Sequence, residues 1–123
     1  MKTKLLLIDD EVITLKMTQM LLDQHNYDVE ICLTTSEAIS VLTSSQIDLI
    51  LLDISMPTID GFDFVKLMKS LHINVPVVFL SNKDDEFTLK MAASEGVKRC
   101  VSKSREIAQL PQIIAEVLNE NSL

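Results

Sequence analysis

IDLILLDISMPTIDG, residues 47–61, is the stretch of sequence that decides the fold. Residues 47–52 are apolar apart from one aspartate, which is typical of a central strand covered on both faces. Asp53 follows, and the next segment contains Pro57 and Gly61, which predict a loop. A strand buried on both faces belongs in a parallel sheet with helices on either side.

Working outward, short apolar runs alternate with amphipathic stretches along the whole chain. Strands are predicted at residues 4–8, 28–32, 47–52, 75–80 and 97–101. Helices are predicted after them, over residues 12–25, 36–42, 64–68, 84–96 and 111–118. The pattern predicts an α/β fold, a doubly wound five-stranded parallel sheet flanked by five helices.

Three local features place the helices more closely. Over residues 12–25, apolar side chains recur at helical spacing: Ile13, Met17, Met20 and Leu21. Ser36 is the predicted cap of the second helix. The acidic triplet 84–86 suits the first turn of the fourth helix and Gly96 its end.

Length and composition predict a single domain, residues 1–123. Apolar residues make up 47% and charged residues 24% of the 123, as in ordinary globular proteins. The formal net charge of −7 argues against direct binding to nucleic acid or to an anionic membrane, which attract basic patches. No direct nucleic-acid or membrane partner is expected.

The N-terminal run and the two cysteines add little chemistry. MKTKLLLIDDE begins like a signal peptide, but Asp9 and Asp10 leave an apolar core too short for one, so a cytoplasmic protein is expected. Cys32 and Cys100 lie in separate predicted strands without CxxC spacing. They are interpreted as buried free thiols.

Polar residues follow four of the five predicted strands. They are Asp9 and Asp10, Asp53, Ser81, and Lys103. In an open parallel sheet the carboxyl ends of the strands form the binding crevice, so these side chains are expected to lie side by side. Taken singly, each is more often a helix cap, a turn former or a surface charge. Their joint occurrence is what favours a site.

Three crowded carboxylates repel one another unless a cation neutralises them. Mg²⁺ is the natural candidate because it binds one or two carboxylates together with waters and leaves room for phosphate oxygens. A carboxylate beside such an ion can act as nucleophile toward a phosphoryl group, here Asp53. Ser81 is placed to donate a hydrogen bond to a phosphoryl oxygen, and Lys103 to supply positive charge.

Two sequence motifs relate these residues to a known protein family. Residues 7–11, LIDDE, and residues 53–61, DISMPTIDG, resemble the acidic motif and the phosphoacceptor loop of the receiver (response regulator) domains of two-component signalling, the CheY-like family. Ser81 and Lys103 match the family's hydroxyl and lysine, and the likeness covers essentially the whole chain. It implies a flavodoxin-like sheet with strand order 2-1-3-4-5.

The resemblance also implies a function, that of a phosphorylation switch in a phosphorelay. Asp53 would accept the phosphoryl group from a histidine kinase or phosphotransfer protein. Asp10 would bind Mg²⁺ directly, Asp9 through water, and Ser55 through its backbone carbonyl. Such a protein is a phosphoacceptor that assists its own phosphorylation and dephosphorylation rather than an enzyme.

The implied output surface is the face of the fourth helix, the fifth strand and the fifth helix. Through it the chain would act on a downstream protein or a fused output domain. The expected oligomeric state is a monomer or a weak phosphorylation-dependent dimer.

Three residues depart from the family pattern. Asn82 stands where the family usually has a small residue, so slower phosphorylation by small donors is expected. Cys100 replaces the aromatic that turns inward on activation, and an aromatic rotamer switch therefore cannot operate. Ser104 replaces the proline after the lysine, and Pro111 comes later, so the loop into the last helix is expected to differ.

Rival functions are an unphosphorylated pseudo-receiver that serves as an interaction module, a haloacid dehalogenase-type phosphatase and a nucleotide-binding domain. The phosphatase needs a second aspartate where this chain has Ser55, and with only Gly61 and Gly96 no GxGxxG or P-loop can form. The retained acidic residues, serine and lysine favour the switch over the pseudo-receiver.

Overall fold

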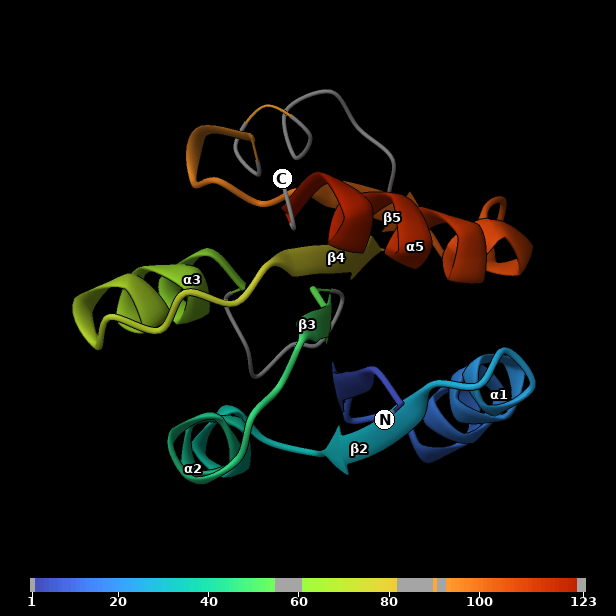
Figure 1. Ribbon diagram of the computed structural model, residues 1–123, viewed down its shortest axis with the longest axis horizontal. Helices are drawn as coiled ribbons and strands as arrows, with labels where there is room; N and C mark the ends of the chain where they lie inside the picture. The colour runs from blue at the N-terminus through green and yellow to red at the C-terminus, as the bar shows by residue number, and fades with distance from the viewer. Residues whose placement is uncertain (1, 55–60, 82–89, 91–92, 122–123) are drawn as a thin grey trace.

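A computed structural model describes residues 2–54, 61–81, 90 and 93–121 of the chain. The described part contains five strands, four α-helices and one short 3₁₀-helix (Figure 1). In chain order these are β1 (Lys4–Ile8), α1 (Val12–Asp23), β2 (Asp28–Cys32), α2 (Thr35–Ser44), β3 (Leu49–Asp53), α3 (Gly61–Ser70), β4 (Val77–Ser81), β5 (Arg99–Ser102), η1 (Ile107–Gln109) and α5 (Leu110–Asn121).

The five strands form one parallel sheet in the order β2-β1-β3-β4-β5, which confirms the predicted fold class and strand order. The chain runs outward from β1 to one edge, and then returns across the centre to the other. The order reverses between β1 and β3, and in such sheets the crevice at that reversal is where ligands bind.

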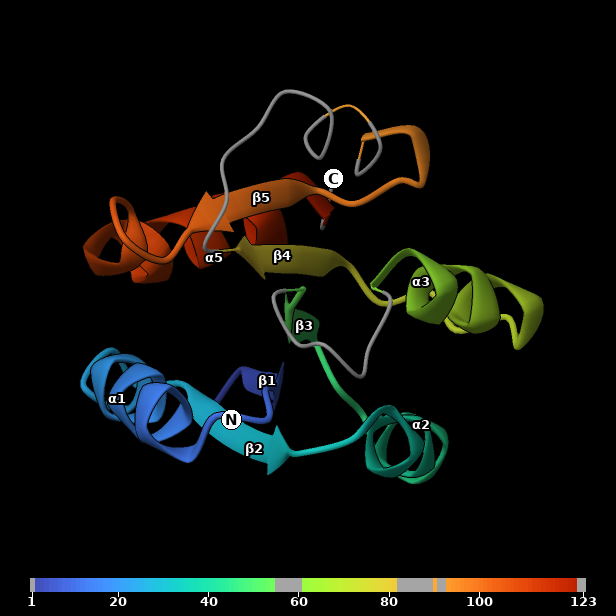
Figure 2. The ribbon, with the colours of Figure 1, turned by 180° about the vertical axis from the view of Figure 1, so that it is seen from behind.

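Two apolar layers cover the sheet, one on each face. The first contains alternate residues of the central strands with α2 and α3; the second contains the intervening strand residues with α1 and α5. Figures 1 and 2 show these helix pairs on opposite sides of the sheet. Residues 49–52 of β3 are fully buried, four consecutive positions that supply both layers in turn.

The bounds of β1 and β2 are as predicted, and those of the other three strands differ by one to two residues. β3 begins at Leu49 rather than at residue 47, and just before it the Asp48 carboxylate accepts a hydrogen bond from the backbone N–H of Lys4 at 2.8 Å. β4 and β5 also start two residues later than predicted and end one residue later. Asp53 and Ser81 are consequently the last residues of their strands.

Helix α1 is where predicted, but it buries a different face. Its buried residues are Leu15, Thr18 and Leu22, and the hydroxyl of Thr18 donates to the carbonyl of Thr14 at 2.9 Å. The predicted apolar set is largely exposed: Ile13 73%, Met17 67% and Met20 64%. The spacing identified the helix correctly, and the apolar set that marked it is not the set that packs on the sheet.

Helix α2 is capped two residues earlier than predicted. The Thr34 hydroxyl, not Ser36, accepts a hydrogen bond from the N–H of Glu37 at 3.1 Å. The Glu37 carboxylate in turn accepts from the N–H of Leu33, the residue before the cap, at 3.4 Å. The cap satisfies one unpaired donor at the helix start, and the Glu37 side chain fixes the chain that enters the helix.

The predicted fourth helix, residues 84–96, lies mostly outside the described residues. Gly96 itself is described, and its φ of +80° is the left-handed conformation predicted for a helix end. The predicted free thiols are confirmed for Cys32, which is buried, and for Cys100, which is half-buried. Within the described residues, no helix is long and apolar enough to cross a membrane.

Candidate functional site

Four strand ends meet at the carboxyl edge of the sheet. Asp9 follows β1, Asp53 ends β3, Ser81 ends β4, and Lys103 follows β5. Asp9, Asp53 and Ser81 are each at least 97% buried although they are polar. The predicted grouping of these four residues is therefore what the fold produces.

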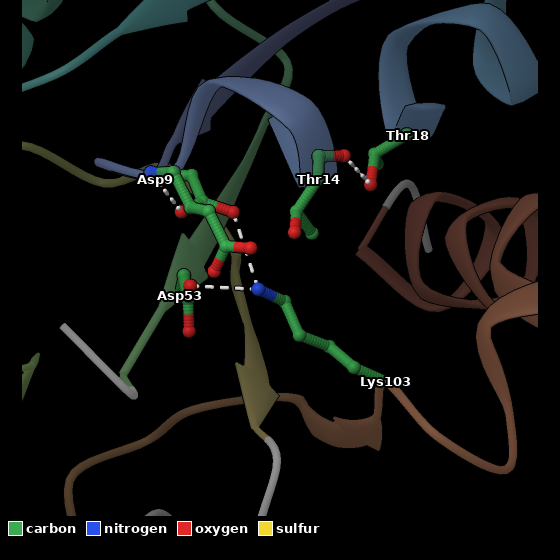
Figure 3. Close-up of polar contacts among 6 residues, drawn as sticks. Asp9, Thr14, Thr18, Asp53 and Lys103 are labelled. Atoms are coloured by element: carbon green, nitrogen blue, oxygen red, sulfur yellow. Dashed lines mark hydrogen bonds and ion pairs between the residues drawn. The ribbon is translucent and has the colours of Figure 1, made fainter. Parts of the chain in front are cut away.

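Lys103 joins the two buried aspartates. Its Nζ lies 2.7 Å from Asp53 Oδ2 and 3.2 Å from Asp9 Oδ2 (Figure 3). The lysine side chain is only 9% exposed, so the ammonium interacts with both carboxylates largely out of water. One cation thus neutralises part of the charge at the ends of the two central strands.

The backbone fixes both ends of this bridge. The N–H of Asp9 donates to the carbonyl of Cys32 on β2, and Asp9 Oδ1 accepts from the N–H of Glu11 at 3.0 Å. The N–H of Lys103 donates to the carbonyl of Ser81 at 2.8 Å, one residue beyond the last pair of β4 and β5. The site is built on strands and on the turns directly after them.

Burial and crowding act on the protonation of two groups. Burial raises the pKa of Asp9, the hydrogen bond from Glu11 opposes this, and the nearby charge of Asp53 raises the pKa further. For Lys103, burial lowers the pKa, but the hydrogen bond and charge of Asp53, followed by those of Asp9, raise it to a net value above normal. At neutral pH the lysine is charged.

The predicted magnesium ligands are only partly gathered in the described residues. Asp9 and Asp53 share one ammonium, Asp10 is exposed, and Ser55 lies outside the described residues. Within residues 2–54, 61–81, 90 and 93–121, no three His, Cys, Asp or Glu side chains are placed to hold a metal ion. The buried carboxylate pair still suits a hard cation, since its mutual repulsion is what such an ion relieves.

The three departures from the family pattern have different outcomes. Asn82 lies outside the described residues. Cys100 is half-buried and packs against the apolar layer of α2 and α3. Ser104 is exposed, and its Oγ lies 3.2 Å from Oγ of Ser102. The chain then passes through η1 before α5 begins at Leu110, with Pro111 in its first turn as predicted.

A cavity of about 550 Å³ opens beside Lys103, between α1 and the segment from Lys103 to η1. Its lining includes Thr14, Met17, Leu21 and Ile107. Met17 is also part of a stripe of exposed apolar residues on α1: Val12, Ile13, Met17 and Met20. The helical spacing read from the sequence included three of these four residues.

A second feature missed from the sequence is the turn after β5. Glu106 contacts Ser102 twice: its N–H donates to the Ser102 carbonyl at 2.8 Å, and its Oε1 accepts from the Ser102 N–H at 3.1 Å. No motif in the sequence singles out a glutamate at this position. Only the fold shows that it lies against the residue before Lys103.

Comparison with known proteins gives a consistent result. The family model described as "Response regulator receiver domain" matches residues 5–115. Among curated relatives, response regulator SaeR of Staphylococcus epidermidis is 30% identical over 123 residues, and that of Staphylococcus aureus is 31% identical over 119 residues. These matches cover 97% and 94% of this chain but 53% and 52% of the relatives, so the chain spans about half their length.

Solved structures agree on the fold. A CheY-like receiver domain from Methanospirillum hungatei superposes with a TM-score of 0.87 at 21% identity, over 99% of this chain and 98% of that one. The Francisella response regulator 1452 receiver domain gives 0.87 at 23% identity, over 99% and 100%. At such identities the likeness establishes the fold.

Proposed function

The chain belongs to the response regulator receiver domain family of two-component signalling, and from that premise we propose that it is a phosphorylation switch with Asp53 as the phosphoacceptor. The observation that carries this proposal is the shared ammonium of Lys103, 2.7 Å from Asp53 and 3.2 Å from Asp9. A buried acceptor carboxylate with a fixed cation beside it is what phosphoryl transfer to an aspartate requires.

The reaction follows from these groups. An Asp53 carboxylate oxygen attacks the phosphorus of a phosphohistidine, an acyl phosphate bond forms, and the bond from phosphorus to the imidazole nitrogen breaks. The released imidazole keeps the electron pair and takes a proton from water. Lys103 shifts from the free carboxylate to the new phosphoryl oxygens, and the Ser81 hydroxyl at the neighbouring strand end donates a hydrogen bond to them.

A divalent cation, Mg²⁺ in this proposal, supplies charge neutralisation between the acidic residues and the incoming phosphoryl group. Asp9, Asp10 and Asp53 would hold it, with the backbone carbonyl of Ser55 as the fourth ligand from the protein. Asp9 is already fixed by the N–H of Glu11, while exposed Asp10 is free to turn toward the ion. The protein's own part is to hold Asp9 and Asp53 close together at neighbouring strand ends.

The phosphodonor is a histidine kinase or phosphotransfer protein that binds α1. Four large apolar side chains are exposed there, and one member of this stripe, Met17, also lines the cavity beside Lys103. A donor helix packed on the stripe would bring its phosphohistidine to the carboxyl edge of the sheet. Ile13→Asp is then expected to slow transfer from the kinase and leave phosphorylation by a small donor unchanged.

Phosphorylation would alter binding of a downstream protein or of an output domain, since the curated relatives are about twice as long as this chain. The unphosphorylated interaction module is the second candidate. An interaction module would not need a buried lysine between two buried aspartates. Removing these charges from water costs free energy, and apolar residues would fill the same space without that cost. The proposal therefore takes the chain as a switch and not as an enzyme acting on separate substrates.

The test is phosphorylation in vitro. The protein is incubated with Mg²⁺ and acetyl phosphate, and its intact mass and amide NMR spectrum are followed, with Asp53→Asn and a Mg²⁺-free sample as controls. Gain of one phosphoryl group by the wild type alone supports the switch. A wild type that gains none from acetyl phosphate or from a phosphorylated kinase, and does not bind Mg²⁺, makes the chain an interaction module.

A further inference from the structure

The turn after β5 is closed by a single residue, Glu106, through its side chain and its backbone. Its carboxylate accepts the N–H of Ser102 at 3.1 Å, and its own N–H donates to the carbonyl of Ser102 at 2.8 Å. Both polar groups of one backbone residue are therefore bound by one glutamate. The carbonyl of Glu106 accepts from the N–H of Gln109 at 2.9 Å, which ties the same residue to η1.

Ser102 needs this partner because of its place in the sheet. β5 is an edge strand, and successive N–H groups of a strand point to alternate sides. The N–H of Lys103 points to β4, where it binds the carbonyl of Ser81, so that of Ser102 points away from the sheet. Ser102 is 97% buried, and a buried N–H without an acceptor is costly. The Glu106 carboxylate supplies the acceptor.

Lys103 comes directly after this anchored residue. Its backbone is held on one side by Ser81 and on the other by the Ser102 peptide, so the direction in which its side chain leaves the strand depends on the turn. Its Nζ then reaches both Asp53 and Asp9. The bond from the Ser102 N–H to the Glu106 carboxylate restrains the backbone torsions of Ser102, and a change in those torsions would move the ammonium away from at least one carboxylate.

We infer that Glu106 is a positioning residue for Lys103: through its length and its acceptor oxygen, rather than its charge, it holds the lysine where it meets Asp53. The inference rests on the proposed function only for its effect on phosphorylation. In the unphosphorylated protein the Lys103 ammonium already contacts Asp53 and Asp9, and these contacts can be measured without any phosphodonor.

Three variants separate geometry from charge. Glu106→Gln keeps the length and the oxygen acceptor but loses the charge, and Glu106→Asp keeps the charge but is one methylene shorter. Glu106→Ala loses both. Glu120→Ala, which removes a carboxylate from the end of α5 where it lies 3.5 Å from Arg99, is the matched control for lost charge.

The first readout is proton exchange of the Lys103 ammonium, followed by ¹⁵N NMR without phosphodonor. Slow exchange is expected in wild type, Glu106→Gln and Glu120→Ala, and about tenfold faster exchange in Glu106→Asp and Glu106→Ala. If Glu106→Ala does not fold, the comparison of Gln with Asp gives the same answer. Equal exchange in Gln and Asp, or slow exchange in both Asp and Ala, overturns the inference.

The second readout is the rate of phosphorylation by acetyl phosphate. Glu106→Asp should lower it about tenfold, the low end for residues that orient a functional side chain, and Glu106→Gln should stay within about twofold of wild type. In a Lys103→Met background, Glu106→Asp should add nothing. An undiminished effect in that background would mean that Glu106 acts on the reaction by another route, and it would overturn the inference.

The two proposals fail in different ways. If the ammonium loosens in Glu106→Asp as expected but no form of the protein is phosphorylated, the switch is wrong and the positioning role stands. If the wild type is phosphorylated and Glu106→Asp leaves both the ammonium and the rate unchanged, the switch stands and the positioning role is wrong.

Discussion

The middle of the central strands and their carboxyl ends are equally buried but chemically opposite. Leu52 is fully buried and apolar, and Asp53, the next residue, is 97% buried and acidic; Ile8 and Asp9 repeat the contrast on β1. The apolar stretch stabilises the fold through its packing, whereas the acidic ends cost stability and depend on one lysine. Substitutions in the two regions should therefore change the free energy of unfolding by different amounts, and in some cases in opposite directions.

The largest effect is expected in the apolar region, for Phe79→Ala. Phe79 is fully buried on β4, and its ring meets that of Phe62 edge-on at 5.4 Å between centroids. The cavity left behind should lower the free energy of unfolding by about 4 kcal/mol, measured by urea denaturation. Leu67→Ala, at an α3 position that is 45% exposed, is the control and should cost well under half as much. Similar losses in the two variants would contradict the picture of a close-packed layer.

The next effect is expected from Lys103→Met, which keeps an apolar stem but removes the ammonium from two buried carboxylates. Unfolding free energy at pH 7 should fall by about 2–3 kcal/mol. Folding raises the pKa of Lys103, so its stabilisation is complete below the pKa of the unfolded lysine and is lost only as pH rises through the higher folded value.

The deficit of Lys103→Met should also shrink in acid as Asp9 takes up a proton. Exposed Lys98→Met is the control and should change stability by no more than about 0.5 kcal/mol. A Lys103→Met protein as stable as wild type at pH 7 would show that the carboxylates do not need the lysine.

A smaller effect of opposite sign is expected for Asp9→Asn. Folding raises the pKa of Asp9, so its ionised form destabilises the folded protein; this cost is absent below the unfolded pKa and develops as pH rises through the folded one. The amide still accepts from the N–H of Glu11, and the variant should gain about 1 kcal/mol at pH 7 and little at pH 3.

Asp10→Asn is the matched control for Asp9→Asn, since Asp10 is the exposed neighbour. Its unfolding free energy should stay within about 0.5 kcal/mol of wild type across the same pH range. If Asp9→Asn destabilises the protein at pH 7, the acidic end is not the costly region that the comparison makes it.

The smallest effect concerns reactivity and not stability. Cys32 lies beside the acidic end of β1: it pairs with Ile8, and its carbonyl accepts a hydrogen bond from the N–H of Asp9. Its side chain nevertheless lies in the apolar layer of α2 and α3. Burial, followed by the charges of Glu37 and Glu30, raises the pKa of its thiol to about 11. About one thiol in a thousand is then ionised at pH 8, and iodoacetamide should modify native Cys32 at least about a hundredfold more slowly than in urea. Peptide mass spectrometry measures both rates.

Much of the fold could be predicted from sequence because the three central strands are almost entirely apolar. The apolar run before Asp53 follows directly from a strand covered on both faces, and polar residues mark the ends of four of the five strands. The predicted end of the last strand missed Ser102 because a serine at a strand end has no periodicity to mark it. The predicted third strand wrongly included Asp48. The hydrogen bond from the Lys4 N–H to its carboxylate joins residues 44 positions apart, and no local sequence pattern reveals such a contact.

Helix α1 shows why the rest could not be predicted. It carries two apolar stripes, and periodicity alone cannot decide which one faces the sheet. The buried stripe includes Thr18, a polar residue that is tolerated because its hydroxyl bonds within the helix, while the more apolar stripe with Met17 and Met20 is exposed. At the site, Asp9, Asp53 and Lys103 were found because each follows a strand, but Glu106 acts through a backbone contact that leaves no pattern in the sequence.

The ion pairs of Lys103 also make the candidate site depend on the last part of the chain. Its two ion pairs join residues 50 and 94 positions apart in a chain of 123 residues. Asp9 and Asp53 leave the ribosome well before their cation, so a nascent or truncated chain holds two acidic strand ends with nothing between them. The proposed acceptor pocket is therefore complete only in a chain that includes Lys103 and whose β5 is paired with β4.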